Sequence, residues 1–583
     1  MLILGPPSHQ FQYDNDRDLP ITVDSEQLFQ EMQLQTLKHD EVDVEMEQIS
    51  GSILMNNDKS ISHKYWNRIF NILDENRLQL TADITKAIQY VEKEDQLKGA
   101  VDTKEVLLSK ATISDSVFRE LKEKHRRMVE DLPSKLAEST YRKNSKGIVL
   151  IGGGKFSWLS YLSIISLRET GSKLAVEIIM PTKRDYKREI DFCNKILPPL
   201  QAKCVVLPDV LGETVMKERS FSSFQFKSLA LAISSFEHIL MLDSDSLPVS
   251  NPDSIFDSKL YKYYGMITWP DYWKRTVSPK FYELADIEIN ESKRVRYGRF
   301  PLFSPTNEDS NINNEEDKKS IPYHDLQGTI ADMSTESGQL VINKRTHGKT
   351  ILMSLFYNIY GPNLFYKLLA LGEQGEGEKD TYVAAAMVTK QTYYQVKSSI
   401  LTFGYFDEER EYHGVAMGQK NPVIDYELFQ ELVVKPIMKD SGGYNEGDEK
   451  EEESTIKMKS LDEQIKTLET LSNEKFHNNN ENPLFTIHCN YPKLDPLQYM
   501  ERSDLYDESQ KRLKHRVYGD IKYPKYIKKD DRQKLAMIDF EFEQWNHMNN
   551  ILCVEQLSFS YFEKTDMNEL CQFIDNQVKW LSE

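Results

Sequence analysis

Two carboxylates one residue apart, Asp243 and Asp245, follow directly on the mainly apolar run of residues 238–242. Such a short apolar run is typical of a buried strand in an α/β sheet that helices cover on both faces. Ligands of these sheets bind beyond the carboxyl ends of the strands, where both acids would lie. Neither acid has a lysine or arginine beside it in sequence, so the pair favours a hard divalent cation. The alternative is a plain turn, because Asp and Ser favour turns and Pro248 follows.

Gly152, Gly153 and Gly154 form a second feature that could hold a phosphate. They lie where a predicted strand passes into a helix, so bare backbone N–H groups could receive a phosphate or a nucleotide edge. The spacing matches neither G-x-G-x-x-G nor a P-loop, and a tight turn alone would also require glycines. Lys227 is the one cation of an apolar helix predicted over residues 222–235. Its ammonium group either reaches solvent or neutralises a ligand phosphate.

Aromatic residues are dense in the segment 263–275, which contains Trp269, Asp271 and Trp273. Such density usually packs a core. The alternative is a sugar site, because the C–H face of a sugar also stacks on Trp or Tyr.

Several polar residues further along the chain adjoin predicted strands or helices. Glu336 and Gln339 precede an apolar strand at residues 340–342, and Asp380 precedes a helix. Acids at a helix start are often only caps. His488 ends a short apolar strand. It is either a core histidine or the third ligand of a Mn²⁺-like ion, which accepts imidazole together with carboxylates.

Strands and helices alternate around these residues, as expected for a Rossmann-like α/β sheet flanked by helices. The predicted strands and helices before the acids are, in order, a strand at 147–151, a helix at 157–168, a strand at 174–180, a helix at 187–197, a strand at 204–207 and the helix at 222–235.

Length and charge restrict the function classes. A chain of 583 residues is too long for one simple core. A net charge of -19 argues against a nucleic-acid binder, because phosphate backbones are held by clustered Lys and Arg. No apolar run approaches the ~18 residues of a membrane span, so a soluble chain is expected.

The cysteines leave the redox compartment open. The 5 cysteines form no C-x-x-C pair, which argues against a structural zinc site. The sequon at Asn290 is a weak indication of the secretory pathway.

Composition predicts four segments. A polar tail and a helical stem occupy residues 1–145, with the helical pattern starting near residue 25. The catalytic core covers 146–439 and contains a polar insertion at 304–320. An acidic low-complexity insertion with one helix near 461–471 covers 440–482, and 483–583 completes the site and adds helices.

The sequence resembles the fungal Golgi α-1,2-mannosyltransferases of the Mnn type, glycosyltransferase family 71, over about residues 145–435 and 483–500. The stretches that carry the resemblance are G-I-V-L-I-G-G-G, G-S-K-L-A-V-E-I, S-S-F-E-H-I-L-M-L-D-S-D, W-P-D-Y-W-K-R-T, E-S-G-Q-L-V-I-N-K, G-E-K-D-T and H-C-N-Y-P-K-L-D-P. It implies a GT-A-like core, GDP-mannose as donor, an α-mannoside of an N-glycan as acceptor, Mn²⁺ as metal and transfer with retention. It also implies residence in the Golgi lumen. Family members carry an N-terminal membrane anchor, and none is visible in this sequence.

The resemblance also implies roles for individual residues, although it names no nucleophile. Asp243 and Asp245 would hold the metal together with His488, and Asp380 would act near the reacting sugar. Gly152, Gly153, Gly154, Lys227 and Ser244 would bind the donor. The substrate side would be lined by Trp269, Asp271, Trp273, Glu336 and Gln339.

Three other functions stay open at this point. An α-1,3-mannosyltransferase would share all these motifs. A phosphatase of the haloacid-dehalogenase type also places D-x-D after an apolar strand, but it continues to Thr or Val where this chain has Leu247. A lectin-like module would bind mannan through its aromatic residues and would require neither acid.

Overall fold

The computed structural model describes residues 59–79, 83–302, 312, 318–436, 460–477, 481–529 and 532–583. The predicted tail at 1–24, most of the insertion at 304–320 and the acidic stretch at 440–459 lie outside these residues. Among the helices in the described ranges, none combines the length and the apolar character that a bilayer crossing requires.

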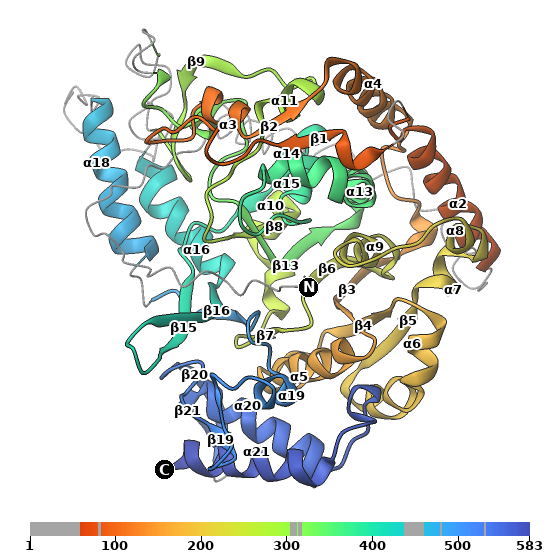
Figure 1. The fold of residues 1–583 in the computed structure, drawn as a ribbon, viewed down its shortest axis with the longest axis vertical. Coiled ribbons are helices and arrows are strands. Elements are labelled where there is room, and N and C mark those ends of the chain that lie inside the picture. The colour runs from red at the N-terminus through yellow and green to blue at the C-terminus, as the bar shows by residue number, and fades with distance from the viewer. Residues whose placement is uncertain are drawn as a thin grey trace, which may run out of the picture.

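A seven-stranded mixed sheet forms the centre of the molecule, in the order β5-β4-β3-β6-β13-β8-β14 (Figure 1). Only β13 runs antiparallel to its neighbours, so the sheet is mixed as predicted. Helices cover it, which confirms the predicted GT-A-like class. The bounds are β3 (Arg142–Ile151), β4 (Ala175–Met180), β5 (Ala202–Val206), β6 (Phe236–Leu242), β8 (Met266–Pro270), β13 (Thr335–Asn343) and β14 (Tyr394–Gln395).

Alternation along β6 creates two hydrophobic cores. Leu240 and Leu242 pack into one core, and Ile239 and Met241 pack into the other. Successive side chains of a strand point to opposite faces, so a run without polar residues is suited to a strand buried on both sides. The first core contains α5 (Lys155–Glu169) and the C-terminal helices α20 (Phe540–Met548) and α21 (Met567–Ser582). The second contains α9 (Gln225–Ile233), α13 (Lys344–Ile359) and α15 (Thr381–Val388).

A second sheet brings distant segments beside the end of β6. Its four strands lie in the order β15-β16-β17-β7. Their bounds are β7 (Ser246–Pro248), β15 (Leu401–Phe406), β16 (Tyr412–Lys420) and β17 (Leu484–His488). Because β7 starts just after Asp245 and pairs with β17, the register places His488 opposite Ser246. This pairing carries the end of β17 to the acids.

The N-terminal part is only partly the helical stem that the sequence predicts. Its helices are α2 (Lys59–Glu75), α3 (Lys104–Ser109) and α4 (Asp115–Asp131). Between them, β1 (Ile88–Tyr90) and β2 (Ala111–Ile113) form an antiparallel pair that apolar periodicity did not indicate. Buried residues of α2 and α4 belong to the second core, so this part packs against the sheet.

The C-terminal part forms the lower end of the molecule in Figure 1. It contains the predicted helices and, beyond that prediction, the antiparallel hairpin of β20 (Lys522–Lys529) and β21 (Arg532–Asp539). Helix α18 (Leu461–Leu471) has the predicted bounds. Its start is fixed by a capping box between Ser460 and Glu463.

The remaining helices and strands are short and connect these parts. They are α6 (Lys183–Arg188), α7 (Leu207–Leu211), α8 (Glu213–Glu218), α10 (Lys259–Tyr264), α11 (Pro279–Leu284), α14 (Tyr366–Ala370), α16 (Pro422–Phe429), α19 (Pro496–Met500), β9 (Asn290–Arg294), β10 (Arg296–Tyr297), β11 (Phe300–Pro301), β12 (Leu326–Gln327), β18 (Tyr506–Asp507) and β19 (Arg512–Leu513). Disulfides join Cys193 to Cys204 and Cys553 to Cys571.

Candidate active site

Main-chain hydrogen bonds fix the position of the two acids at the end of β6. The N–H of Asp243 donates to the carbonyl of Gly338 at 2.8 Å, and the carbonyl of Asp245 accepts from the N–H of Cys489 at 2.9 Å. The N–H of Ser246 closes a turn on the carbonyl of Asp243 at 3.0 Å. The acids therefore do lie in a turn, and that turn joins three segments of the chain.

Asp243, Asp245 and His488 form a cluster that could hold a metal ion, named here the metal-ligand group. One possible ligand atom from each residue lies within 4.8 Å of the others. The Nε2 atom of His488 is 3.5 Å from Asp245 Oδ1 and 3.9 Å from Asp243 Oδ2. The structure thus brings together the three residues that the sequence predicts as ligands.

A carboxylate behind the imidazole orients His488. Glu336 Oε1 lies 3.0 Å from His488 Nδ1, which leaves Nε2 directed to the acids. The Gln339 amide donates to Glu336 Oε2 at 2.6 Å, and its oxygen accepts from Thr486 at 2.7 Å. Carboxylates in this position commonly fix the tautomer of a metal-binding histidine. Glu336 and Gln339 are therefore placed behind the metal-ligand group.

Burial and neighbouring charges shift the ionisation of the group. Burial alone would lower the pKa of His488, but Asp245 and Glu336 outweigh it and raise that pKa to about 10. Burial raises the pKa of Asp243. At Asp245, His488 and Lys493 outweigh burial and lower the pKa of the carboxyl below its usual range. The imidazolium thus compensates the charge of the buried Asp245 and the partly buried Asp243.

Gly338 leaves the space that this arrangement requires. A Cβ atom at this position would come within 2.6 Å of both Glu336 Oε1 and His488 Nδ1, and within 2.8 Å of Ser246 Oγ. Contacts this short force atoms to shift. A glycine in the middle of β13 weakens a strand, so its presence is explained by the close approach of these polar atoms.

Two lysines contact the acids. One precedes the acids in the sequence and the other follows them. Lys227 Nζ lies 2.7 Å from Asp243 Oδ2 and 2.6 Å from Glu378 Oε1. Lys493 pairs with Asp245. Each acid therefore already has a cation, and these ammonium groups are also suited to a ligand diphosphate.

The donor atoms fit a divalent metal of borderline character. Two carboxylates and one imidazole are ligands that Mn²⁺ accepts. Next to them, Ser246 Oγ is buried and has no hydrogen-bond partner among the described residues. A buried hydroxyl without a partner costs free energy, which a ligand or a water molecule at this position would offset.

The glycine loop adjoins the same edge of the sheet. Gly153 and Gly154 have positive φ angles of 98° and 55°, and Gly154 precedes the first residue of α5. Ser244 donates to the carbonyl of Ile151 at 2.7 Å, which ties this loop to the acids. A Cβ at Gly154 would meet no atom within 4 Å, so the space beside it is open.

Asp271 lies at the same edge of the central sheet as the acids, whereas Trp269 does not. The Asp271 carboxylate pairs with Lys379 at 2.7 Å. The half-buried Trp273 is nearby, since its carbonyl accepts the Ser334 N–H at 3.0 Å, and Ser334 Oγ also accepts from Lys379. Trp269 is fully buried, stacked on Phe485 at 5.5 Å, so it packs the core.

Asp380, expected near the reacting sugar, has another role in the fold. Its carboxylate pairs with the buried guanidinium of Arg275 at 2.6 Å and accepts the Thr335 N–H at 2.8 Å. A buried charge pair of this kind is stable because both partners are hydrogen-bonded. The structure therefore gives Asp380 a structural position, and it does not bring it to the metal-ligand group.

Known proteins match most of this chain. It is 56% identical over 532 residues to alpha-1,2-mannosyltransferase MNN23 of Candida albicans, which is 90% of this chain and 85% of that protein. The chain belongs to the Mnn-type α-1,2-mannosyltransferase family. MNN22 of the same organism is 39% identical over 539 residues, 90% of this chain and 86% of that protein. Residues 145–421 match the family described as "Mannosyltransferase putative".

The similarity of this chain to solved structures is much weaker than its similarity to the Mnn-type family. Mouse xyloside xylosyltransferase 1, in its apo form, is 14% identical, with a TM-score of 0.25 over 43% of this chain and 84% of that chain. A likeness this slight says nothing about the substrate.

Three charged residues of this Mnn-type site were not assigned a role from the sequence. Glu378 and Lys379 lie in the G-E-K-D-T stretch, and Lys493 lies in H-C-N-Y-P-K-L-D-P. Charged residues in polar stretches usually face solvent, so nothing in their local pattern marks them. Their presence in motifs that already carry the resemblance was the available signal.

Proposed function

We propose that this protein is a metal-dependent mannosyltransferase that moves mannose from GDP-mannose to a mannose hydroxyl of an N-linked mannan. The transfer would form α-1,2 linkages with retention of configuration. The observation that supports this most directly is the convergence of Asp243, Asp245 and His488 in a chain whose relatives are named alpha-1,2-mannosyltransferases. The names of these relatives support the linkage, and the resemblance of the motifs supports the donor and the stereochemistry.

In this proposal the metal-ligand group holds Mn²⁺. A bound divalent cation supplies Lewis-acid stabilisation of the negative charge on the departing diphosphate. Glu336 keeps His488 Nε2 directed toward the acids. Lys227 and Lys493 provide further positive charge for the diphosphate, each being within contact of one acid.

The glycine loop binds the nucleoside end of the donor. The N–H groups of Gly152 and Gly153 already bond to the Ile179 carbonyl and to Ser157 Oγ, so this loop offers the open space beside Gly154. Ser244 connects the loop to the acids. Asp271 and Trp273 follow β8, whose Trp269 is opposite Glu336 in the register, and these two residues would line the transferred sugar.

We place the protein in the Golgi lumen. Two disulfides among the described residues support an oxidising compartment, because such bonds persist in secreted and luminal proteins and are rare in the cytosol. The number and spacing of the cysteines alone had left the redox compartment open.

The test is mannose transfer from GDP-mannose to an α-mannoside acceptor, with Mn²⁺ and with chelator. The Asp245→Asn variant should lose at least about 10³-fold in kcat/KM, because several kcal/mol of charge stabilisation depend on the metal. Asp575→Asn is the matched control, since Asp575 forms an exposed ion pair with Lys579 on α21. Full activity in chelator, or of Asp245→Asn, would exclude the metal mechanism.

A further inference from the structure

Several exposed aromatic side chains lie on segments that adjoin those carrying the metal-ligand group and the glycine loop. Where the structure describes side chains, the exposed aromatic residues are Tyr90, Phe156, Phe224, Phe406 and Tyr491. All except Tyr90 lie on segments that border the catalytic edge of the sheet. Large apolar side chains exposed together mark interaction sites more often than single scattered ones.

Two of these residues border the donor side. Phe156 follows Gly154 on the first turn of α5. Phe224 precedes α9, which carries Lys227, and the carbonyl of Phe224 accepts the Lys227 N–H at 3.1 Å. Because the glycine loop and Lys227 belong to the proposed donor site, the opposite side of the metal-ligand group is left for the acceptor.

The β15–β16 hairpin extends from that opposite side. Thr402, Met417 and His488 lie opposite one another across three strands. The extra residue of the bulge belongs to β16, so alternation along β15 is undisturbed, and Phe406 shares the face of Thr402. Phe406 is therefore on the same face of the sheet as His488, about 13 Å further along the strand direction.

Phe406 and Tyr412 form an aromatic pair on this face. They are directly opposite in the register, and their ring centroids are 5.1 Å apart. Phe406 is 64% exposed, which is unusual for an apolar side chain in a paired strand. Exposed aromatic faces with polar groups nearby are suited to a sugar, which has apolar C–H faces and hydroxyl edges.

Tyr491 lies between this pair and the metal-ligand group. It follows His488 by three positions, is 47% exposed, and its N–H donates to the carbonyl of Val415 on β16 at 3.3 Å. The guanidinium of Arg502 lies 5.1 Å from the centre of the ring and holds one side of it. Tyr491 is thereby anchored beside the hairpin.

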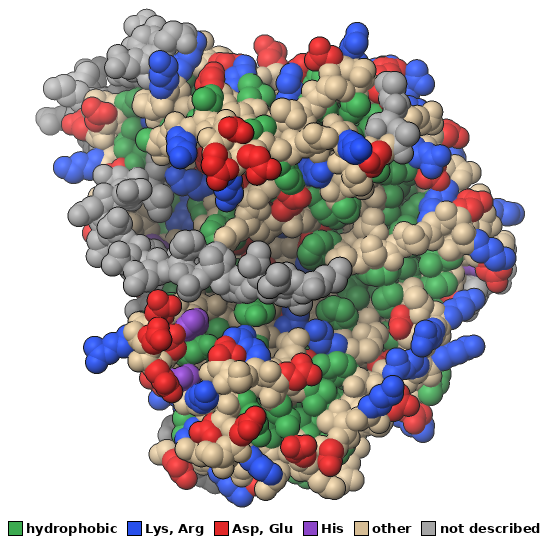
Figure 2. Space-filling model, in the orientation of Figure 1, with side chains coloured by type: hydrophobic (Ala, Val, Ile, Leu, Met, Phe, Trp, Pro, Cys, Tyr) green, Lys and Arg blue, Asp and Glu red, His purple; other side chains and the backbone are tan. Residues whose placement is uncertain are grey.

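We propose that Tyr491, Phe406 and Tyr412 form an extended acceptor subsite that binds mannose units of the acceptor chain beyond the one that receives the new sugar. This inference rests on the proposed function and names how the acceptor is held. The hairpin turn carries four acids, Asp407, Glu408, Glu409 and Glu411, and one cation, Arg410, so the occupant is a neutral glycan and not an anion. Figure 2 shows acidic side chains at the left of the view, where the β15–β16 hairpin lies in Figure 1.

The experiment compares acceptors of different length. Binding and transfer are measured with α-methyl mannoside and with α-linked mannooligosaccharides of two to six units. The Phe406→Ala/Tyr412→Ala and Tyr491→Ala variants should each raise the KM for the longer acceptors about tenfold. The KM for GDP-mannose and for α-methyl mannoside should stay unchanged, and Tyr491→Phe should behave as wild type.

Leu97→Ala is the control, because Leu97 is 56% exposed and belongs to the N-terminal part. Equal loss for short and long acceptors, or no loss, would overturn the subsite. A change in oligomeric state of the hairpin variant without a change in KM would assign the surface to a protein partner, and would also overturn it. Calorimetry of oligosaccharide binding without donor tests the subsite separately from the proposed function. Binding can be present or absent whether or not the protein transfers mannose from GDP-mannose.

Discussion

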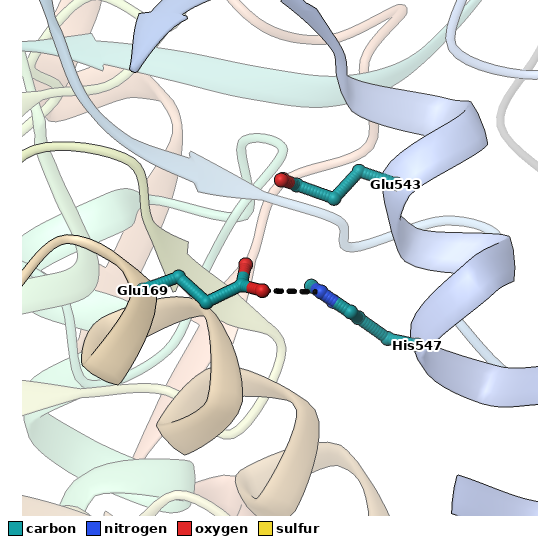
Figure 3. A group of neighbouring side chains, drawn as sticks. All are labelled: Glu169, Glu543 and His547. Atoms are coloured by element: carbon teal, nitrogen blue, oxygen red, sulfur yellow. Dashed lines mark hydrogen bonds and ion pairs between the residues drawn. The ribbon is translucent and has the colours of Figure 1, made fainter. Parts of the chain in front are cut away.

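Several groups of side chains in this protein combine two carboxylates with an imidazole, and two of them have very different surroundings. The metal-ligand group contains Asp243, Asp245 and His488. The second group, at the contact between α5 and α20, contains Glu169, Glu543 and His547 (Figure 3). Each offers two carboxylates and an imidazole within 4.8 Å.

The orientation of the imidazole distinguishes the groups. In the metal-ligand group, Glu336 contacts Nδ1 of His488 and Nε2 is directed to both acids. In the second group, Nε2 of His547 contacts Glu169 alone at 3.0 Å, and its buried Nδ1 has no partner among the described residues. Lys525 lies 2.7 Å from both Glu169 and Glu543. Both glutamates of the second group share this one lysine, so the group links α5 of the core to the C-terminal part.

Replacing the histidine of each group by glutamine should produce the largest difference in activity between the groups. His488→Gln removes a ligand nitrogen, so we expect a loss of about 10² to 10³-fold in kcat/KM for mannose transfer. His547→Gln should stay within about twofold of wild type, because its group holds parts of the fold together. A comparable loss in both variants would remove the distinction between the groups.

The glutamates should separate the groups by metal affinity. Glu336→Gln weakens the contact that orients His488, so the Kd for Mn²⁺ should rise about 10- to 100-fold. Glu543→Gln should leave that Kd unchanged. Titration of Mn²⁺ followed by electron paramagnetic resonance measures both without turnover, and weaker binding in Glu543→Gln would identify the second group as a metal site.

The smallest effect concerns stability. Lys525 is 14% exposed and touches two glutamates, so Lys525→Met should lower the free energy of unfolding by about 1 to 2 kcal/mol. Lys579→Met is the control, because that lysine is 68% exposed and its ion pair should contribute about 0.5 kcal/mol or less. Urea denaturation of both variants measures the difference, and equal stabilities would show that the bridge contributes nothing.

Local patterns were sufficient to predict the centre of the fold. The apolar run at residues 238–242 and the glycines after residue 151 mark β6 and the start of α5, because burial and backbone geometry restrict the residue types there. The helix predicted near 461–471 is α18, and the structure adds the capping box at Ser460 that fixes its start. The hairpin β20–β21 escaped prediction, since its lysine-rich sequence does not alternate polar and apolar residues.

The site was predictable only in part, because its contacts join distant positions. The acids stand out because they follow a buried strand, and His488 stands out because it ends another. The pairing of Asp380 with Arg275, which are 105 positions apart, is invisible to any local pattern. The same holds for Lys493, which reaches Asp245 across 248 positions.

The main-chain bonds from Asp243 to Gly338 and from Asp245 to Cys489 have a consequence for biosynthesis. Strand β6 emerges from the ribosome long before β17, and the lysine that contacts Asp245 is made later still. A growing chain can therefore assemble much of its central sheet while it still lacks a complete binding site. If the proposed site carries the activity, mannose transfer first becomes detectable when the polypeptide has been translated at least to residue 493 and has folded back onto its middle.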